Sequence, residues 1–460
     1  MRRTKFVGLG AAALLVLAAC NPSADDGDDE TTDAGNGGTD VSTDEGNGDD
    51  ATGVSIDISD APEQTLTVWD QEVRGGQNEQ MERLNEAFED KYPNIKIDRN
   101  SQSFDDLQTT LRLALTSADA PDVVQANNGR ATMGQFVETG QIQCLDDYSE
   151  AYGWEDRFGD ILSYSSYSDD GTVFGEGCVY GLPQVGEVVG IYYSESKLDE
   201  LGLDYPENWE ELEAQLPEIV EAGEVPLVLG NIDKWPSIHV FGAIQGQYAD
   251  AEDIRTLGYG NPGGSWDTDA NIAAAAQFQD WVNDGYFNRG VNGSDYDQVW
   301  QDFANGEGVY LIAGSWLAAD LNDAMGDDIR FALPPSNGPT TTGGTGLPFA
   351  VTSAAEDVDV AAAYIDFITS DEAMEILAET GNVPVLNASD FADDADRVVG
   401  DVMTAFDDLV ADGNIVPYLD WATPTMDQVM GDAIQNLLAG NSTPEEFVLV
   451  VEEAYAEATN

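Results

Sequence analysis

Residues 66–97 read LTVWDQEVRGGQNEQMERLNEAFEDKYPNIKI, in which two strand patterns flank a helix pattern. The alternating, β-rich run 66–69 predicts a strand, and apolar residues at helical spacing predict a helix over 78–92. Residues 95–97 give the next strand pattern, and a helix over 104–116 and a short buried strand over 122–124 continue the series. Alternating strands and helices are typical of an α/β lobe with a mainly parallel sheet, which is the fold that we predict here.

The loops that follow these strands are the first candidates for a binding site, because ligands of open α/β sheets bind beyond the carboxyl ends of the strands. The candidates are Trp69, Asp70, Glu72 and Arg74 after the first strand and Asn127, Asn128 and Arg130 after the third. Asparagine is also favoured in turns, so a turn role for Asn127 and Asn128 is the alternative.

A second series of strand and helix patterns begins near residue 188. It comprises strands over 188–193, 225–229, 309–312 and 347–352 and helices over 209–222, 272–284, 360–368, 372–379, 402–410, 426–438 and 444–456. Trp235 and His239 fall between these patterns, in a stretch that we interpret as a loop after Leu229.

Six short motifs occur in an order that resembles the extracellular solute-binding proteins of family 1, the class that includes maltose- and trehalose-binding proteins of ABC importers. They are APDVV (120–124), YGLP (180–183) with GIYYS (190–194), PENWEEL (206–212), FANGEG (303–308) with GSW (314–316), AAAYIDFI (361–368) and GNVP (381–384). Each motif is weak alone, but six of them in register across residues 66–457 argue against chance.

This resemblance implies a two-lobed periplasmic-binding-protein-like fold of type II, with two α/β lobes joined by a hinge and a ligand cleft between them. Each lobe is discontinuous in sequence: residues 63–184 with 349–416 form lobe 1, and residues 185–348 with 417–460 form lobe 2. The chain is then expected to cross between lobes near 181–187, 346–349 and 415–421. A solute closes such lobes only if it contacts both of them, and the expected partners are this solute and the permease subunits of an ABC importer.

The resemblance also implies residues of the cleft. Trp316 stands where family members place a stacking aromatic, and Glu187 stands where a side chain often reaches the solute at the hinge. A core tryptophan and a solvated surface glutamate are the respective alternatives. Trp235 and Trp421 are further aromatic candidates, and Gly344 belongs to a glycine-rich run that suits a hinge or a close approach of backbone to ligand.

The expected solute is a sugar, because sugars need aromatic platforms together with carboxylates and amides. A non-sugar solute such as a polyamine is the alternative. A secreted glycoside hydrolase is a further alternative. It would need two carboxylates at a defined separation, and a chain this acidic cannot exclude such a pair. No sequence motif of an enzyme supports this alternative. We expect no catalytic residues, no metal, no cofactor and a monomer.

The first 19 residues predict a lipoprotein export signal. Three basic residues precede the apolar run 6–17, and LAAC (17–20) resembles the bacterial lipobox, in which Cys20 receives the lipid. The alternative is a plain secretory signal with an incidental Cys20. Residues 20–62 are acidic and nearly free of large apolar side chains, so we predict a disordered tether. The protein is then held at the extracellular face of the cytoplasmic membrane by its lipid anchor only.

The chain has 88 acidic and 17 basic residues, a formal net charge of −71. Nucleic acid and anionic lipid are excluded as partners, since both would be repelled. A dense carboxylate surface suits a halophilic, high-salt setting, in which self-repulsion is screened, and a merely acidic secreted protein is the alternative. With Cys20 lipidated, Cys144 and Cys178 remain as an even pair, which predicts a disulfide outside the cell.

Overall fold

The computed structural model describes residues 53–117, 120–336 and 338–459. The predicted export signal, Cys20 and the predicted tether up to residue 52 lie outside the described residues. Among the described helices, none combines the length and the apolar composition that crossing a membrane requires.

The first sheet contains the strands that the N-terminal pattern predicts. Its strand order is β11-β3-β1-β2, with β1 (Gln64–Asp70), β2 (Ile95–Ser101), β3 (Val123–Gln125) and β11 (Phe349–Val351). The strands β1, β2 and β3 are parallel, and β11 is antiparallel to β3. The late strand β11 therefore returns the chain to the first sheet.

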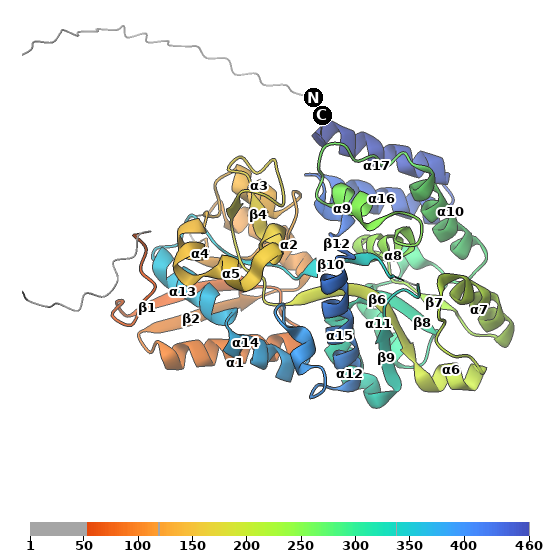
Figure 1. The fold of residues 1–460 in the computed structure, drawn as a ribbon, viewed down its shortest axis with the longest axis horizontal. Helices are drawn as coiled ribbons and strands as arrows, with labels where there is room; N and C mark the ends of the chain where they lie inside the picture. Colours follow the sequence, from red (N-terminus) through yellow and green to blue (C-terminus); the bar gives the residue numbers. More distant parts are fainter. Residues whose placement is uncertain (1–52, 118–119, 337, 460) are drawn as a thin grey trace, which may run out of the picture. The chain divides into compact units, whose positions relative to one another are not determined.

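Helices pack on this sheet through the apolar faces that their periodicity predicts. They are α1 (Gly75–Lys91), α2 (Phe104–Ala114), α13 (Val358–Ile368) and α14 (Asp371–Glu379), and α1 contacts both α13 and α14 (Figure 1). The helix α1 buries Met81, Leu84 and Phe88 in a core shared with α13. Burial of such side chains stabilises a fold by about 1.5–3 kcal/mol each.

A group of short elements lies between β3 and the second sheet. They are α3 (Met133–Glu138), α4 (Asp146–Tyr152), α5 (Trp154–Phe158), η1 (Gly159–Ser165), β4 (Ser166–Tyr167) and β5 (Cys178–Val179). A disulfide joins Cys144, just before α4, to Cys178 of β5, with their Cα atoms 5.8 Å apart. The bond closes a segment made of short elements, where a crosslink restricts the unfolded chain.

The second sheet has the strand order β12-β10-β6-β8-β7, and β9 also pairs with β6. Its strands are β6 (Gly186–Ser194), β7 (Leu227–Val228), β8 (Tyr310–Gly314), β9 (Ile329–Ala332), β10 (Thr341–Thr345) and β12 (Ile415–Val416). The central strand β6 is antiparallel to β8, β9 and β10, whereas β7 is parallel to β8. The sheet is therefore mixed, and β7 and β8 end at the same edge.

Most of the remaining helices surround this second sheet. They are α6 (Glu195–Leu201), α7 (Trp209–Ala222), α8 (Trp235–Gln245), α9 (Ala251–Gly258), α10 (Asp269–Asn283), α11 (Tyr296–Ala304), α12 (Ala318–Met325), α15 (Arg397–Asp412), α16 (Met426–Leu438) and α17 (Pro444–Thr459). Single 3-10 turns also occur, namely η2 (Val291–Gly293), η3 (Ser315–Leu317), η4 (Gly326–Asp328), η5 (Ala388–Phe391) and η6 (Leu419–Trp421). Figure 1 shows α10, α16 and α17 together near the C-terminus.

The structure differs from the sequence expectations at the end of the predicted tether. Residues 53–62 lie against the first sheet's core, where Ile58 is 2% exposed. The side-chain amide of Asn94 donates to the carbonyl oxygens of Ile58 and Ala61. The tether prediction fails here because Ile58, with Val54 and Ala61 packed beside it, and the backbone hydrogen bonds hold this short segment.

Two further differences concern the second sheet. The stretch interpreted as a loop after Leu229 contains α8, in which Trp235 is the first residue and His239 lies in the second turn. Pro236 at the second position suits a helix start, where its missing N–H is not needed. The passage expected near 415–421 is found earlier, because Val185 bridges to Pro384 and α15 already packs against β6 and β9.

Candidate functional site

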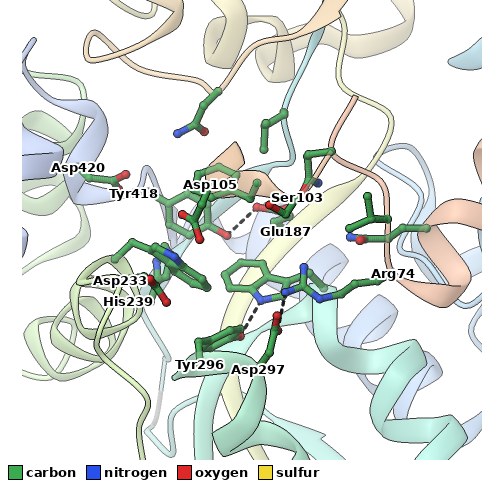
Figure 2. A pocket seen from close by; sticks show the side chains of 18 of the residues that line it. Arg74, Ser103, Asp105, Glu187, Asp233, His239, Tyr296, Asp297, Tyr418 and Asp420 are labelled. Atoms are coloured by element: carbon green, nitrogen blue, oxygen red, sulfur yellow. Dashed lines mark hydrogen bonds and ion pairs between the residues drawn. The ribbon is translucent and has the colours of Figure 1, made fainter. Parts of the chain in front are cut away.

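A cavity of about 260 Å³ lies between loops of the first sheet and elements of the second (Figure 2). Its lining from the first side is Gln71, Val73, Arg74, Gln77, Ser103, Phe104, Asp105 and Asn127. Its lining from the second side is Glu187, Asp233, Trp235, His239, Asp295, Tyr296, Asp297, Trp316, Leu347, Tyr418, Asp420 and Trp421. The carboxyl ends of β1, β2, β3, β7 and β8 all lead into this lining, which is where α/β sheets bind ligands.

Rings on the second side form an aromatic wall, defined by Trp235, His239, Tyr296, Trp316 and Tyr418. The Trp316 ring lies 6.0 Å from that of Trp235 and 5.3 Å from that of His239, centroid to centroid. Its indole N–H donates to the Tyr296 hydroxyl over 2.8 Å. These contacts fix the ring edge, so the wall is a preformed apolar surface for a ligand.

Glycine at position 314 makes room for the Trp316 indole. A Cβ added to Gly314 would lie 2.0 Å from the Trp316 ring. Glycine is therefore required for steric reasons at the first position of the GSW motif. The chain turns after β8, and the Trp316 indole lies back over Gly314.

Loops on the first side form a polar wall, defined by Gln71, Arg74, Gln77, Ser103, Asp105 and Asn127. Arg74 reaches across the cavity, with its Nη2 3.0 Å from Asp297 Oδ1 and its Nε 3.8 Å from Asp320 Oδ2. Ser103 caps α2 by accepting a hydrogen bond from the Asp106 N–H, which fixes the loop after β2. The Arg74 pairs hold the two sides of the cavity together in this structure.

Glu187 and Tyr418 meet at the back of the cavity. The Tyr418 hydroxyl donates to Glu187 Oε2 over 3.1 Å (Figure 2). The pKa of the Glu187 carboxyl is raised to about 8, mainly by burial; the Tyr418 hydrogen bond and Arg74 oppose this shift, and the nearby Glu72 adds to it. At neutral pH this carboxyl is therefore largely protonated and can donate a hydrogen bond.

Four polar side-chain atoms of the lining lie buried without a hydrogen-bond partner in the structure. They are Gln77 Oε1, Trp235 Nε1, His239 Nδ1 and Asp420 Oδ1. Burial alone lowers the pKa of His239 to about 3, so its ring is neutral, and burial raises the pKa of Asp420 to about 7. Buried polar atoms are normally satisfied, so these four stand out among the polar groups of the lining.

A second cavity of about 290 Å³ adjoins the first beyond an aromatic pair. Phe104 and Trp235 line both cavities, and their ring centroids are 6.2 Å apart. The adjoining cavity has an amide-rich lining that includes Gln108, Asn127 and Asn128.

Six of the predicted site residues lie on the main cavity: Arg74, Asn127, Glu187, Trp235, Trp316 and Trp421. Asn128 lies on the adjoining cavity, where it donates to the Tyr164 carbonyl and the Thr345 hydroxyl.

The other predicted residues lie away from both cavities. Asp70 is completely buried and pairs bidentately with Arg99 at 2.6 and 2.7 Å, and Glu72 accepts from Gln125 and Gln71. Trp69 packs against the core, and Arg130 is buried beside Trp421, whose carbonyl accepts from the Arg130 N–H. Gly344 has a φ of +133° and lies close to the Tyr164 ring, next to a separate cavity. Its role is therefore conformational, since few side chains tolerate that backbone.

Sequence reasoning missed most of the polar lining. The loop after β2, which holds Ser103 and Asp105, follows the same carboxyl-end rule as the loops after β1 and β3, so the rule would have found it. Tyr296, Asp297 and Tyr418 carry no local signal, because they reach the cavity through packing of α11 and of the segment after β12.

No metal site emerges from the part of the chain that the structure describes. The one group there with suitable spacing is Cys144, Asp146 and Cys178, and both sulfurs are used by the disulfide.

The family model for "bacterial extracellular solute-binding protein" matches residues 75–375. A multiple sugar-binding protein of Streptococcus mutans is 23% identical over 313 residues, which cover 66% of this chain and 71% of that protein.

Solved structures with the same fold cover most of this chain. A chitin oligosaccharide binding protein has a TM-score of 0.72 and 21% identity, and the match covers 86% of this chain and 98% of that one. A solute-binding protein of an ABC transporter from Thermotoga lettingae, bound with α-D-tagatose, has a TM-score of 0.71 and 18% identity, with 86% and 99% covered. The predicted two-lobed α/β fold of a periplasmic-type binding protein is confirmed.

Proposed function

Because the chain belongs to the bacterial extracellular solute-binding proteins, we propose that it is the lipid-anchored substrate-binding component of an ABC importer and captures a sugar or oligosaccharide. The observation that carries this proposal is the cavity, in which an aromatic wall faces a polar wall. A sugar ring has an apolar C–H face and a polar rim, and the two walls match these two surfaces. The names of the similar proteins described above also refer to sugars, namely multiple sugars, a chitin oligosaccharide and α-D-tagatose.

We propose that capture is coupled to closure of two lobes built on the two sheets. Arg74 of the first side bonds to Asp297 of the second, and Phe104 meets Trp235, and such contacts between the two sides support the proposed closure. Three segments, 181–187, 345–349 and the one around Pro384, connect the two sides, and β6 and β10 pair beside the first two. A ligand that touches both walls favours this arrangement because only contacts specific to the closed state shift the equilibrium.

The lobe boundaries remain part of the proposal. We keep the assignment of residues 63–184 and the returning β11 to the first lobe. The packing of α15 on β6 and β9 favours placing residues after Pro384 in the second lobe.

A thermal-shift screen against mono- and oligosaccharides tests the sugar proposal. A ligand that fills the cavity should raise the melting temperature, since binding to the native state alone stabilises it by about 2.7 kcal/mol at 100 times the Kd. A screen in which no sugar stabilises the protein, while a solute of another class does, would overturn the sugar assignment but leave the transport role.

The membrane anchor is tested through Cys20. We expect Cys20→Ala to release the protein into the medium, because a stable anchor needs lipid chains that this position alone would carry. Mass spectrometry of the mature protein checks the modification, and an unmodified Cys20 would remove the anchor from the proposal.

A further inference from the structure

Carboxyl groups outnumber basic groups on the main cavity. Six carboxyl side chains line it, those of Asp105, Glu187, Asp233, Asp295, Asp297 and Asp420, against the single guanidinium of Arg74. Arg74 is already engaged by Asp297 and Asp320, and the nearby Lys234 pairs with Asp432 at 2.6 Å. Within the described residues, Asp105, Glu187, Asp233 and Asp420 therefore have no lysine or arginine as an ion-pair partner.

The general acidity of the chain does not account for this imbalance. Surface carboxylates are stabilised by water, whereas Glu187 and Asp420 are partly buried, and this burial raises the pKa of both carboxyls. The ionisable groups around Glu187 are Glu72, Arg74, Tyr296 and Tyr418, and the group nearest to Asp420 is another carboxylate, that of Asp427.

The same lining offers hydrogen-bond acceptors that nothing in the protein uses. Gln77 is only 7% exposed, and its Oε1 lies on the cavity without a donor. Asp420 Oδ1 is also buried and unpartnered. An ammonium group brings three donors and a positive charge, so it meets both the missing donors and the missing cation.

We propose that the solute is an amine-bearing sugar whose protonated amines pair separately with the cavity carboxyls of Glu187 and Asp420 while a ring lies on the aromatic wall. This inference rests on the proposed function and specifies the class of sugar. Figure 2 shows the labelled carboxyls of Asp105, Glu187, Asp233, Asp297 and Asp420 around the pocket. A linear polyamine shares the ammonium chemistry but has no ring face for Trp316, and it is the alternative that the experiment separates.

Calorimetric titration of the whole folded protein with four probes tests the inference. Three are β-1,4-linked glucose-type disaccharides that differ only at C2, where they carry a hydroxyl, an N-acetylamino group or a protonated amine, and the fourth is spermidine. We expect the amine disaccharide to bind on the order of ten-fold or more tightly than either neutral one, because charge-assisted hydrogen bonds are about twice as strong as neutral ones.

Salt separates the cavity from the charge of the whole chain. A net charge of −71 attracts any cation weakly, but that attraction is screened at about 1 M salt, where the Debye length is about 3 Å. The contacts inside the cavity are screened much less, so the preference for the amine should persist at 1 M salt.

Matched variants locate the effect. Glu187→Gln and Asp420→Asn keep the side-chain size and should each reduce the preference for the amine several-fold. Glu307→Gln, on an exposed turn after α11, removes the same charge outside the cavity and should leave the preference unchanged. Melting temperatures of all variants show whether they fold.

Proton linkage gives an independent readout that does not need a variant. An ammonium group beside Glu187 or Asp420 favours the ionised carboxyl, so binding of the amine disaccharide near pH 6.5 should release protons. Titrations in two buffers of different ionisation enthalpy measure this release, and the neutral disaccharides should show none.

The outcomes separate the inference from the proposed function. Equal affinities, a preference for a neutral disaccharide, or a preference that vanishes at 1 M salt overturn the amine but leave a sugar-binding protein. Tightest binding of spermidine overturns the sugar as well. Absence of binding by all four probes, with a neutral sugar identified in the thermal-shift screen, overturns the inference alone.

Discussion

The two walls of the cavity are built by different means. The aromatic wall consists of rings that touch one another and lie partly in the core, as in the 4.7 Å contact between His239 and Tyr418. The polar wall consists of side chains on loops after β1, β2 and β3, which are joined to the other side mainly through Arg74.

The aromatic wall is therefore a rigid surface and the polar wall an adjustable one, and we expect them to contribute differently to binding. Rings fixed by several neighbours lose little conformational entropy when a ligand arrives, so they supply contact area at low cost. Long polar side chains on the other wall have fewer fixed neighbours, so in the proposed closure we expect them to adjust and to supply selectivity. Changes on the aromatic wall should therefore alter affinity most, and changes on the polar wall should alter closure.

The largest expected effect is that of Trp316→Ala. The ring lies on the cavity and is partly exposed, so its removal should weaken sugar binding by several kcal/mol, on the order of 100-fold, as for other binding hot spots. The melting temperature without ligand should fall little. Calorimetry and thermal unfolding of the same variant measure both quantities.

Trp266→Ala is the matched control, because Trp266 is completely buried away from the cavity. It should lose about 3–5 kcal/mol of stability through the void that it leaves, with little change in affinity at temperatures where it is folded. If Trp316→Ala behaves like Trp266→Ala, the aromatic wall is core and the proposed site must move.

A smaller effect is expected for Arg74→Met on the polar wall. The variant keeps the apolar stem but loses the pairs with Asp297 and Asp320, which are partly exposed and worth about 1 kcal/mol together. Affinity should fall about five-fold, and small-angle scattering should show a more open protein without ligand. Arg83→Met removes an ion pair within the first side, between α1 and α14, and should change neither. An Arg74→Met protein as compact as the unmutated one would remove Arg74 as a latch.

The smallest expected effect concerns the pH dependence of stability at Glu187. Its pKa is raised to about 8 in the folded protein, so the folded state holds this proton more tightly than the unfolded state does. This contribution is fully present below the usual glutamate pKa and is lost as the pH rises through about 8. Glu187→Gln should therefore flatten the decline of the melting temperature between about pH 5 and 8. An unchanged slope would mean that the carboxyl is hydrated rather than enclosed.

The succession of strands and helices along the chain, and the places where the strands end, could be predicted from the sequence. Residues 66–97 alternate and then repeat at helical spacing, and the structure has β1, α1 and β2 there. Such periodicity reflects which face of each element is buried, a property that neighbouring residues determine together. The family motifs also made it possible to predict the second lobe and the site candidates Trp316 and Glu187.

What the sequence could not provide is the direction of each side chain after its strand. Asp70 and Arg74 belong to one loop and were both predicted to bind ligand, yet Asp70 is turned inward because Arg99, on the next strand, forms a bidentate pair with it. Tyr418 and Tyr296 reach the cavity from segments far apart in the chain. The α/β alternation, the strand ends and the excess of carboxylates follow from local pattern and composition, so they can be predicted without a structure. Which carboxylates face the cavity without a cation depends on long-range packing, because ion pairing joins residues far apart in the chain and no local pattern encodes it.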